Sequence, residues 1–184
     1  MSTWDILAQA EEQRKTADKL QWEGTFKDYL EIVAQNPKVA DLSHARMYDM
    51  IASAGVEDPG EGLPKVYKFF EGELFGMERT IQHLVEEYFA PAARRLDIRK
   101  RILMLVGPVG GGKSTLSTLL KKGLEKHSKT EAGAVYAIKG SPMHEEPLHL
   151  IPEDLRESFK KQTGIHIEGD LDPEIGRASC RERV

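Results

Sequence analysis

Apolar residues recur at helical spacing through the first third of the chain. Residues 4–20 place apolar side chains among many charges, a weak amphipathic pattern that predicts a helix. A second helix is expected to follow Thr25, a residue type that caps helices, and to stop at Pro37. A third is expected to run from an N-cap at Ser43 to Gly55. The pattern therefore predicts an all-helical N-terminal segment.

The helical pattern is then interrupted by glycine, proline and acidic residues. The stretch VEDPGEGLPKVY (56–67) predicts an exposed linker, so residues 1–65 are expected to form the helical segment with its linker. Residues 66–76 are aromatic-rich and fit a short strand or turn. Residues 78–96 regain the helical period, with Pro91 inside or ending the helix.

Two short apolar runs flank one more amphipathic stretch. ILMLV (102–106) is wholly apolar and follows charged residues, as a central parallel strand does. AVYAIKG (134–140) is the next strand candidate, and residues 114–126 between them have helical periodicity. Strand, helix and strand at this spacing form a βαβ unit, which predicts an α/β fold with a parallel sheet.

The glycine-rich stretch between the first strand and its helix carries the main chemical signal. GPVGGGKS (107–114) fits the phosphate-binding P-loop pattern G-x-x-x-x-G-K-[ST] without a mismatch, in the expected strand–loop–helix context. The predicted nucleotide-binding residues are Gly107, Pro108, Val109, Gly110, Gly111, Gly112, Lys113, Ser114 and Thr115. The alternative is a glycine-rich turn without a ligand.

Each residue type in this loop has a chemical role. Glycines let several backbone N–H groups turn toward one point, and the following helix adds the positive end of its dipole. Lys113 is expected to reach the β- and γ-phosphates, Ser114 to offer its hydroxyl to Mg²⁺, and Thr115 to lie near the α-phosphate. The sequence thus predicts a site for a nucleotide with magnesium.

Hydrolysis by P-loop proteins also requires an acidic residue after a second strand. No run of four apolar residues followed by Asp-Asp or Asp-Glu occurs after Lys113. The nearest stretch is HIEGDL (166–171), in which Glu168 and Gly169 break the pattern. The catalytic residues are therefore left unassigned.

Two other stretches allow more than one interpretation. AVYAIK has the V-A-I-K form in which protein kinases place a phosphate-binding lysine, but the other kinase motifs do not occur. Lys139 is therefore interpreted as a surface charge, with a direct nucleotide role as the alternative.

SPMHEEPLHLIP (141–152) combines histidines with acids. A metal site is the less favoured interpretation because Pro147 breaks helical spacing, and a polar loop near the phosphate site is preferred.

Composition narrows the class of protein. The chain has 184 residues and a net charge of −4, which gives no electrostatic case for nucleic acid. No apolar run approaches the roughly 20 residues that cross a bilayer, and acidic residues near the N-terminus argue against a signal peptide. A cytoplasmic protein without a membrane partner is expected. Cys180 is the single cysteine, so no internal disulfide can form.

The last residues have a different character. EIGRASCRERV (174–184) lacks apolar periodicity and resembles the translation of a sequencing-adapter oligonucleotide. It is interpreted as a non-native tail on a natural chain that continues differently after Pro173. A disordered basic C-terminus is the alternative.

Several stretches together resemble the N-terminal part of bacterial PrkA-type serine protein kinases. The similarity runs from Trp22 to Pro173 and includes WEGTFKDYL, HARMYDMI, ELFGMERTI, VEEYFAPAARRLDIRKRILMLVGPVGGGKST, GAVYAIKGSPMHEEPLHLIP and IHIEGDLDP. It implies that residues 66–173 form the N-terminal part of an AAA-type αβα P-loop ATPase domain, which is incomplete in this chain. It also implies that this domain binds ATP and Mg²⁺ at residues 107–115. ELFGMER (73–79) looks like the segment beside the adenine in such domains.

The resemblance also implies an activity. The intact protein is expected to phosphorylate Ser/Thr of a protein substrate with MgATP. The alternatives are an ATPase of a remodelling or protease-linked machine, assembled as a homo-oligomer through the AAA module, and a nucleotide-gated regulatory module. The acidic motif, the sensor residues and the arginine finger would lie beyond Pro173. The 184-residue chain by itself is therefore expected to be inactive.

Overall fold

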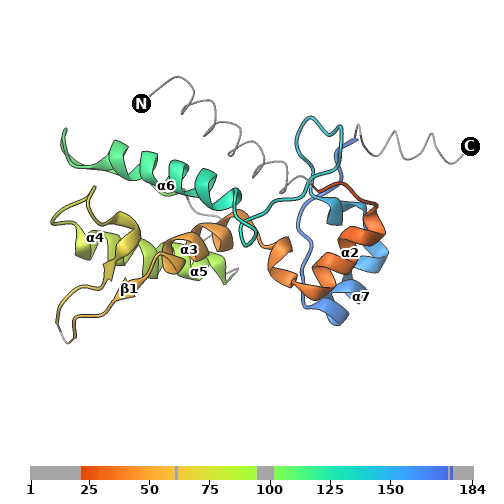
Figure 1. Cartoon of the computed structure of the whole chain (residues 1–184), viewed down its shortest axis with the longest axis horizontal. Coiled ribbons are helices and arrows are strands. Elements are labelled where there is room, and N and C mark those ends of the chain that lie inside the picture. The colour runs from red at the N-terminus through yellow and green to blue at the C-terminus, as the bar shows by residue number, and fades with distance from the viewer. Residues whose placement is uncertain (1–21, 61, 95–101, 174, 176–184) are drawn as a thin grey trace, which may run out of the picture. The chain divides into compact units, whose positions relative to one another are not determined.

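The computed structural model describes residues 22–60, 62–94, 102–173 and 175. They divide into two compact units: unit 1 combines the described parts of 1–40 and 134–184, and unit 2 is 41–133. Figure 1 shows the elements of both units. The helix predicted over 4–20 lies outside the described residues, as does the tail except for Ile175.

The first helix of unit 1 begins as the sequence predicts. Helix α2 spans Phe26–Gln35, and the Thr25 hydroxyl accepts a hydrogen bond from the backbone N–H of Asp28 at 3.3 Å. The Asp28 carboxylate accepts in return from the Thr25 backbone N–H at 2.7 Å, which completes a capping box. The hydrogen bond from Thr25 holds the pKa of Asp28 below its usual range. A 3₁₀ turn, η1 (Pro37–Ala40), follows.

The rest of unit 1 is built from short elements around one core. A 3₁₀ turn, η5 (Pro147–Leu150), precedes helix α7 (Glu153–Thr163), which ends at Gly164 with φ +73°. Phe159 of α7 packs against a core to which α2 also contributes. The buried residues of this core are Tyr29, Val33, Ala40, Leu148, Ile151, Ile165 and Ile167.

Unit 2 opens with helix α3 (Ser43–Ser53). The prediction of the helix is confirmed, but the prediction that Ser43 is its N-cap is wrong. Leu42 occupies the cap position, and no side chain caps the helix there. Instead, the Arg46 guanidinium donates from Nε to the backbone oxygen of Asp41 at 2.9 Å. Gly55 follows the helix with φ +109°, a conformation that favours glycine.

The predicted linker closes into a small hairpin. Strands β1 (Val56–Glu57) and β2 (Val66–Tyr67) pair antiparallel, and the short turn η2 (Lys68–Phe70) follows. Lys68 forms an ion pair with Glu57 at 2.6 Å, and this hydrogen bond raises the pKa of Lys68. Of the described residues between the strands, 58–60 and 62–63 are exposed, as the sequence predicts, and 64–65 are half-buried.

The helix predicted over 78–96 is confirmed over 78–93 but is not uniform. Helix α4 (Glu78–His83) passes into a π-helical segment, η3 (Leu84–Phe89), and then into α5 (Ala90–Ala93). The Ala90 N–H donates to the oxygen of Val85, five residues earlier, as π-helical geometry requires. Pro91 follows directly and has no N–H to donate, so it fits the widened turn.

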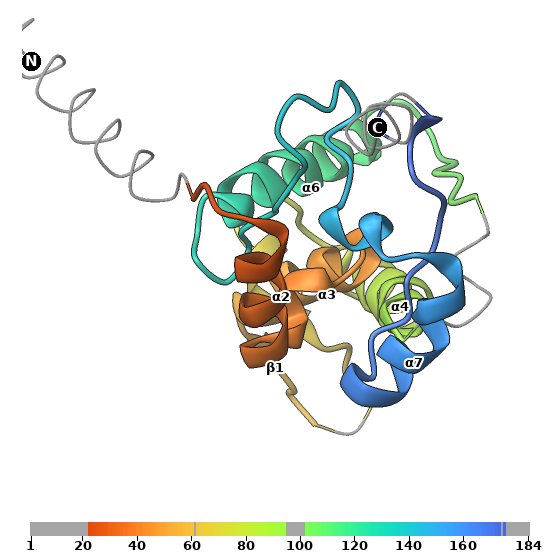
Figure 2. The ribbon, with the colours of Figure 1, turned by 90° about the vertical axis from the view of Figure 1, so that its right-hand side faces the viewer.

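Helix α6 (Lys113–Ser128) completes unit 2 and packs along α3, as Figures 1 and 2 both show. The contact is close at Gly123, where a Cβ would lie 2.4 Å from Phe69 Cζ and 2.9 Å from Met50 Sδ. The buried core of this unit consists of Met50, Ile51, Tyr67, Phe70, Leu74, Ile81, Leu84, Val85, Phe89 and Leu116.

The two strands predicted at 102–106 and 134–140 do not form, and these predictions are wrong. The described residues contain one ladder, the antiparallel β1–β2 pair, so the αβα layering is not built within them. A parallel strand is stable only when neighbouring strands satisfy its backbone groups and helices cover both faces. Within 102–106 the exposed fraction alternates, from 92% at Ile102 to 38% at Leu103 and 77% at Met104. The run is therefore extended but unpaired in the described structure.

Candidate nucleotide-binding site

The glycine-rich loop leads directly into the first turn of α6. Gly110 and Gly112 have φ values of +81° and +71°, and Gly112 is the N-cap of the helix. The Gly111 N–H donates to the oxygen of Pro108 at 3.2 Å, which closes the turn. These left-handed angles strain any residue with a Cβ, so the glycines at 110 and 112 are a requirement of the backbone.

A second segment packs against this loop. A Cβ added at Gly112 would lie 3.1 Å from Leu74 Cδ2 and 3.1 Å from Met77 Sδ. Leu74 is also part of the buried core of unit 2, so the core positions this segment. The segment, residues 74–77, is called the wall of the site below. The glycine at 112 is thus needed both for its backbone angle and for the close approach of 74–77.

Loop and wall together enclose a hollow of about 740 Å³. Its lining residues are Glu73, Leu74, Phe75, Met77 and 109–115. The structure therefore brings part of the ELFGMER segment beside the glycine-rich loop. Phe75 is 80% exposed, so its ring is available to a ligand in this hollow. The assignment of adenine to this side stays a prediction.

Lys113 folds back over the loop. Its ammonium donates to the backbone oxygens of Gly107 at 2.7 Å and of Pro108 at 2.5 Å. Ser114 and Thr115 lie exposed in the first turn of α6. The hollow is thus lined by the Lys113 ammonium, the positive N-terminal end of the 16-residue helix α6, and the hydroxyl groups of Ser114 and Thr115. These groups are suited to binding phosphate together with a hard cation such as Mg²⁺.

The titratable groups with the clearest pKa shifts lie elsewhere in unit 2. Glu86 pairs with Lys65 at 2.7 Å and accepts from Gln82 Nε2 at 3.0 Å. These hydrogen bonds hold the pKa of Glu86 below its usual range. Burial and the nearby Glu86 carboxylate raise the pKa of Tyr67 to about 12. This cluster joins the hairpin to the α4–η3 helix and has a structural role.

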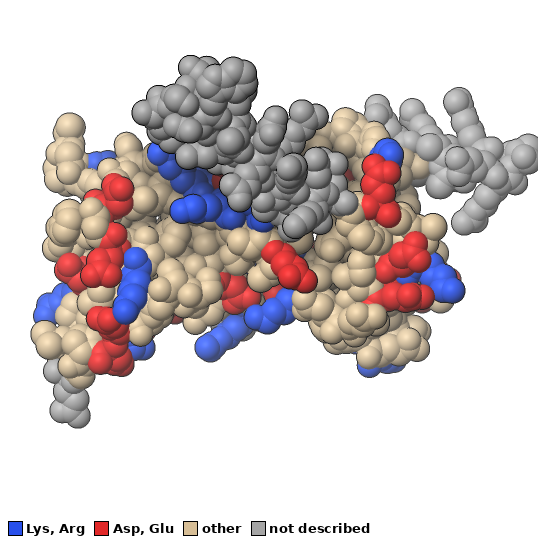
Figure 3. All heavy atoms as spheres, viewed as in Figure 1, with Lys and Arg blue, Asp and Glu red and all other residues tan. Residues whose placement is uncertain are grey.

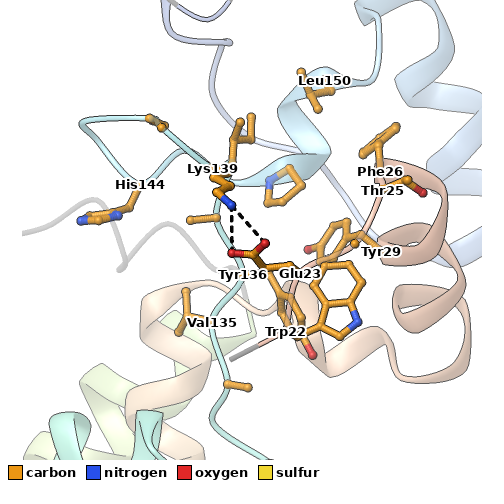
Figure 4. Close-up of a pocket in the computed structure, with 17 residues that line it drawn as sticks. Trp22, Glu23, Thr25, Phe26, Tyr29, Val135, Tyr136, Lys139, His144 and Leu150 are labelled. Carbon is orange, nitrogen blue, oxygen red and sulfur yellow. Dashed lines mark hydrogen bonds and ion pairs between the residues drawn. The ribbon is translucent and has the colours of Figure 1, made fainter. Parts of the chain in front are cut away.

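Unit 1 contains a second hollow, of about 710 Å³ (Figure 4). Trp22 and Tyr29 each contact the ring of Tyr136, with ring centroids 5.3 and 5.4 Å apart. Lys139 is 83% exposed and binds both carboxylate oxygens of Glu23 at 3.0 Å. Lys139 is thus an exposed charge paired with Glu23, and the alternative of a direct nucleotide role stays a prediction.

The histidine- and acid-rich stretch 141–152 adopts turns. Pro147 begins the 3₁₀ turn η5, and the Glu145 N–H donates to the Ser141 hydroxyl at 3.1 Å. Among the described residues, no three His, Cys, Asp or Glu side chains are grouped so as to hold a metal ion. The predicted nearness of this loop to the phosphate site stays a prediction. The sequence did not indicate that His149 would contact both Glu145 and the 168 backbone.

The face drawn in Figure 3 carries acidic and basic side chains together, without one continuous basic field. Among the described helices, none combines the length and apolarity needed to cross a membrane.

The family of the chain follows from comparison with known proteins. The model of the PrkA AAA domain family matches residues 24–179, which is most of the chain. AAA domains are P-loop nucleotide-binding domains, which is the class that the loop geometry indicates. The chain belongs to the PrkA AAA domain family.

Curated relatives agree with this family. The chain is 59% identical over 169 residues to the "ATP-dependent protease PrkA" of Bacillus subtilis, covering 92% of this chain and 26% of that protein. It is 36% identical over 104 residues to the "Serine/threonine kinase YeaG" of Escherichia coli K12, covering 54% of this chain and 15% of that protein. The chain thus spans about a quarter or less of these two relatives. No solved structure matches it.

Proposed function

We propose that this chain binds MgATP with the loop 107–115, in the hollow that residues 109–115 line together with Glu73, Leu74, Phe75 and Met77. The observation that carries the proposal is the glycine-rich loop, which caps α6 in left-handed geometry and holds the Lys113 ammonium. Magnesium would supply charge neutralisation of the phosphates and orient them. The membership in an AAA family supports the choice of ATP.

Each residue of the loop has a separate role in the proposed binding. Lys113 would exchange the oxygens of Gly107 and Pro108 for phosphate oxygens, which are better partners because they carry charge. Ser114 would hold Mg²⁺ through its hydroxyl, and the first N–H groups of α6 would face the phosphates. Phe75 offers an aromatic face for the base.

For the whole protein, we propose ATP-dependent phosphorylation of Ser/Thr in protein substrates. The relative from E. coli carries the name of a serine/threonine kinase. The second candidate is ATP-dependent proteolysis or remodelling by an oligomeric assembly, favoured by the name of the relative that is 59% identical. For either candidate we propose the cytoplasm as the compartment, because both activities consume ATP. Neither assigns a catalytic residue to the 184 residues of this chain.

The test uses the full-length protein, γ-labelled ATP and a mixture of candidate protein substrates. Label on Ser or Thr supports the kinase, and ATP-dependent cleavage of the substrate supports the protease. Each activity is expected to disappear in Lys113→Ala and to persist in Lys139→Ala, a matched change at an exposed lysine paired with Glu23. Full label transfer by Lys113→Ala would show that another site is responsible.

A further inference from the structure

Two charged residues of opposite sign line the hollow at the start of α6. Lys113 belongs to the glycine-rich loop, and Glu73 directly precedes the wall (residues 74–77). The other described residues that line this hollow carry no charge. The hollow therefore offers a cation from one segment of the chain and an anion from another.

The backbone of Glu73 is held in place by the core of unit 2. Its N–H donates to the backbone oxygen of Phe70 at 3.4 Å, and the Leu74 N–H donates to the same oxygen at 3.2 Å. Phe70 and Leu74 are both buried, and a Cβ at Gly112 would lie 3.1 Å from Leu74 Cδ2. Glu73 is thus fixed next to a residue that packs against the loop, while Glu73 itself is exposed.

The neighbouring acidic side chains are engaged elsewhere. The Glu78 carboxylate accepts a hydrogen bond from the Gly76 N–H at 3.1 Å. Glu71 interacts with the charge of Lys68 and does not line the hollow. Within the described part of the chain, the Glu73 carboxylate has neither a hydrogen-bond donor nor an ion-pair partner. It is therefore available to a ligand in the hollow.

The charge of Glu73 decides which part of a nucleotide can lie beside it. An ionised carboxylate only accepts hydrogen bonds, and it repels phosphate groups. Phosphates therefore bind at the loop beside Lys113, and Glu73 faces a part of the nucleotide that carries donors. The ribose directly follows the phosphates, and its two neighbouring hydroxyl groups match the two oxygens of one carboxylate. Acidic side chains bind ribose hydroxyls in the same way in other nucleotide sites.

We propose that Glu73 accepts hydrogen bonds from the ribose hydroxyls of the bound nucleotide and makes the site selective for ribonucleoside triphosphates. The inference rests on the proposed MgATP site at 107–115. It adds a selection of the sugar, which the glycine-rich loop cannot make because the loop contacts phosphates. A nucleotide that lacks the 2′ and 3′ hydroxyl groups leaves the carboxylate without a donor and binds more weakly.

The test is titration calorimetry of the 184-residue chain with magnesium present. The ligands are ATP, 2′,3′-dideoxy-ATP and inorganic tripolyphosphate. The wild type is expected to bind ATP about tenfold more tightly than dideoxy-ATP, because the hydrogen bonds to a charged group are lost. Glu73→Ala should bind ATP as weakly as dideoxy-ATP. Its affinities for dideoxy-ATP and for tripolyphosphate should not fall below those of the wild type.

The matched control is Glu71→Ala, which removes the same charge from a nearby position outside the hollow. This variant should keep the wild-type preference for ATP over dideoxy-ATP. A purely structural role of Glu73 would instead lower the affinity for all three ligands together in Glu73→Ala, and that result would contradict the inference.

Two further results would overturn the inference. One is equal affinity of the wild type for ATP and dideoxy-ATP, or a preference that survives Glu73→Ala. The other is weaker binding of tripolyphosphate alone among the two sugar-independent ligands by Glu73→Ala, since the carboxylate would then act on Mg²⁺. Each of these results leaves the MgATP site standing. Failure of the wild type to bind any of the three ligands would refute the site and the inference together.

Discussion

Gly112 and Gly72 both have left-handed backbone angles, with φ +71° and +85°, but their surroundings differ. A Cβ at Gly112 would press on Leu74 and Met77, whereas a Cβ at Gly72 would meet nothing within 4 Å. The pair separates backbone strain from the close packing that shapes the nucleotide hollow. Both glycines belong to unit 2.

Gly72→Ala is therefore expected to lower the free energy of unfolding by about 1–2 kcal/mol through strain alone. Gly112→Ala should cost more and also weaken ATP binding, because the wall residues must move. Chemical denaturation and nucleotide titration of both variants check this. Equal stability losses with unchanged ATP affinity would show that the contact with Leu74 and Met77 does not shape the site.

Tyr67 gives a prediction of pH dependence. Its pKa is raised from 10.0 to about 12 by burial and by Glu86, so the folded state binds the phenolic proton more tightly than the unfolded state. This contribution is fully present below pH 10 and is lost as the pH rises toward 12. Ultraviolet titration of the phenolate should show one late-titrating tyrosine.

The control for this prediction is Tyr67→Phe. Lysines also titrate in this range, so the difference between wild type and variant isolates the phenol. The late-titrating signal should vanish, and the alkaline loss of stability should become shallower. A variant that keeps the late signal would assign it to another tyrosine.

At the scale of elements, the N-termini of α2 and α3 differ in how the local sequence starts the helix. Thr25 caps α2 within a capping box, whereas Ser43 begins α3 without a side-chain cap. Thr25→Ala is expected to lower the free energy of unfolding by about 1 kcal/mol, and Ser43→Ala by only a few tenths. Chemical denaturation measures both. Equal losses would mean that the capping box contributes nothing specific.

The sequence predicted helices well because their signals are local. These signals depend on residues only a few positions apart. They are the cap at Thr25, the helix stop before Pro37, and the apolar faces of 78–93 and 113–128. The strands at 102–106 and 134–140 failed because a parallel strand needs hydrogen-bonding neighbours from distant sequence. No such neighbour occurs among the described residues.

The candidate site was predictable to the same extent. The loop 107–115 carries its own pattern of glycine, lysine and hydroxyl, so its geometry at the start of α6 follows from local sequence. The wall formed by Leu74 and Met77 was indicated only by resemblance. The back-folded Lys113 was not predicted, since its partners are backbone oxygens that any sequence offers.

At the scale of the whole molecule, the unpaired run 102–106 exposes apolar side chains to solvent. Ile102, Met104 and Val106 are 92%, 77% and 84% exposed, and their alternation places three apolar side chains on one side. Extended, apolar and unpaired backbone is prone to associate with other chains. We expect the 184-residue chain to self-associate with rising concentration.

Met104→Lys is expected to weaken this self-association about tenfold, because it removes roughly 1.5 kcal/mol of apolar burial from the contact. Leu63→Lys is the matched control, since Leu63 is 60% exposed in the loop of the hairpin. Sedimentation over a range of concentrations measures both. Equal effects of the two changes would place the contact elsewhere.

In our proposal, the hollow at the start of α6 binds MgATP through Lys113. Titration calorimetry of the chain with MgATP tests it most directly, with Lys113→Ala and Lys139→Ala compared under the same conditions. We expect one site in the wild type and in Lys139→Ala, and about tenfold to a hundredfold weaker binding in Lys113→Ala. Absence of binding in the wild type, or equal affinity in Lys113→Ala, would contradict it.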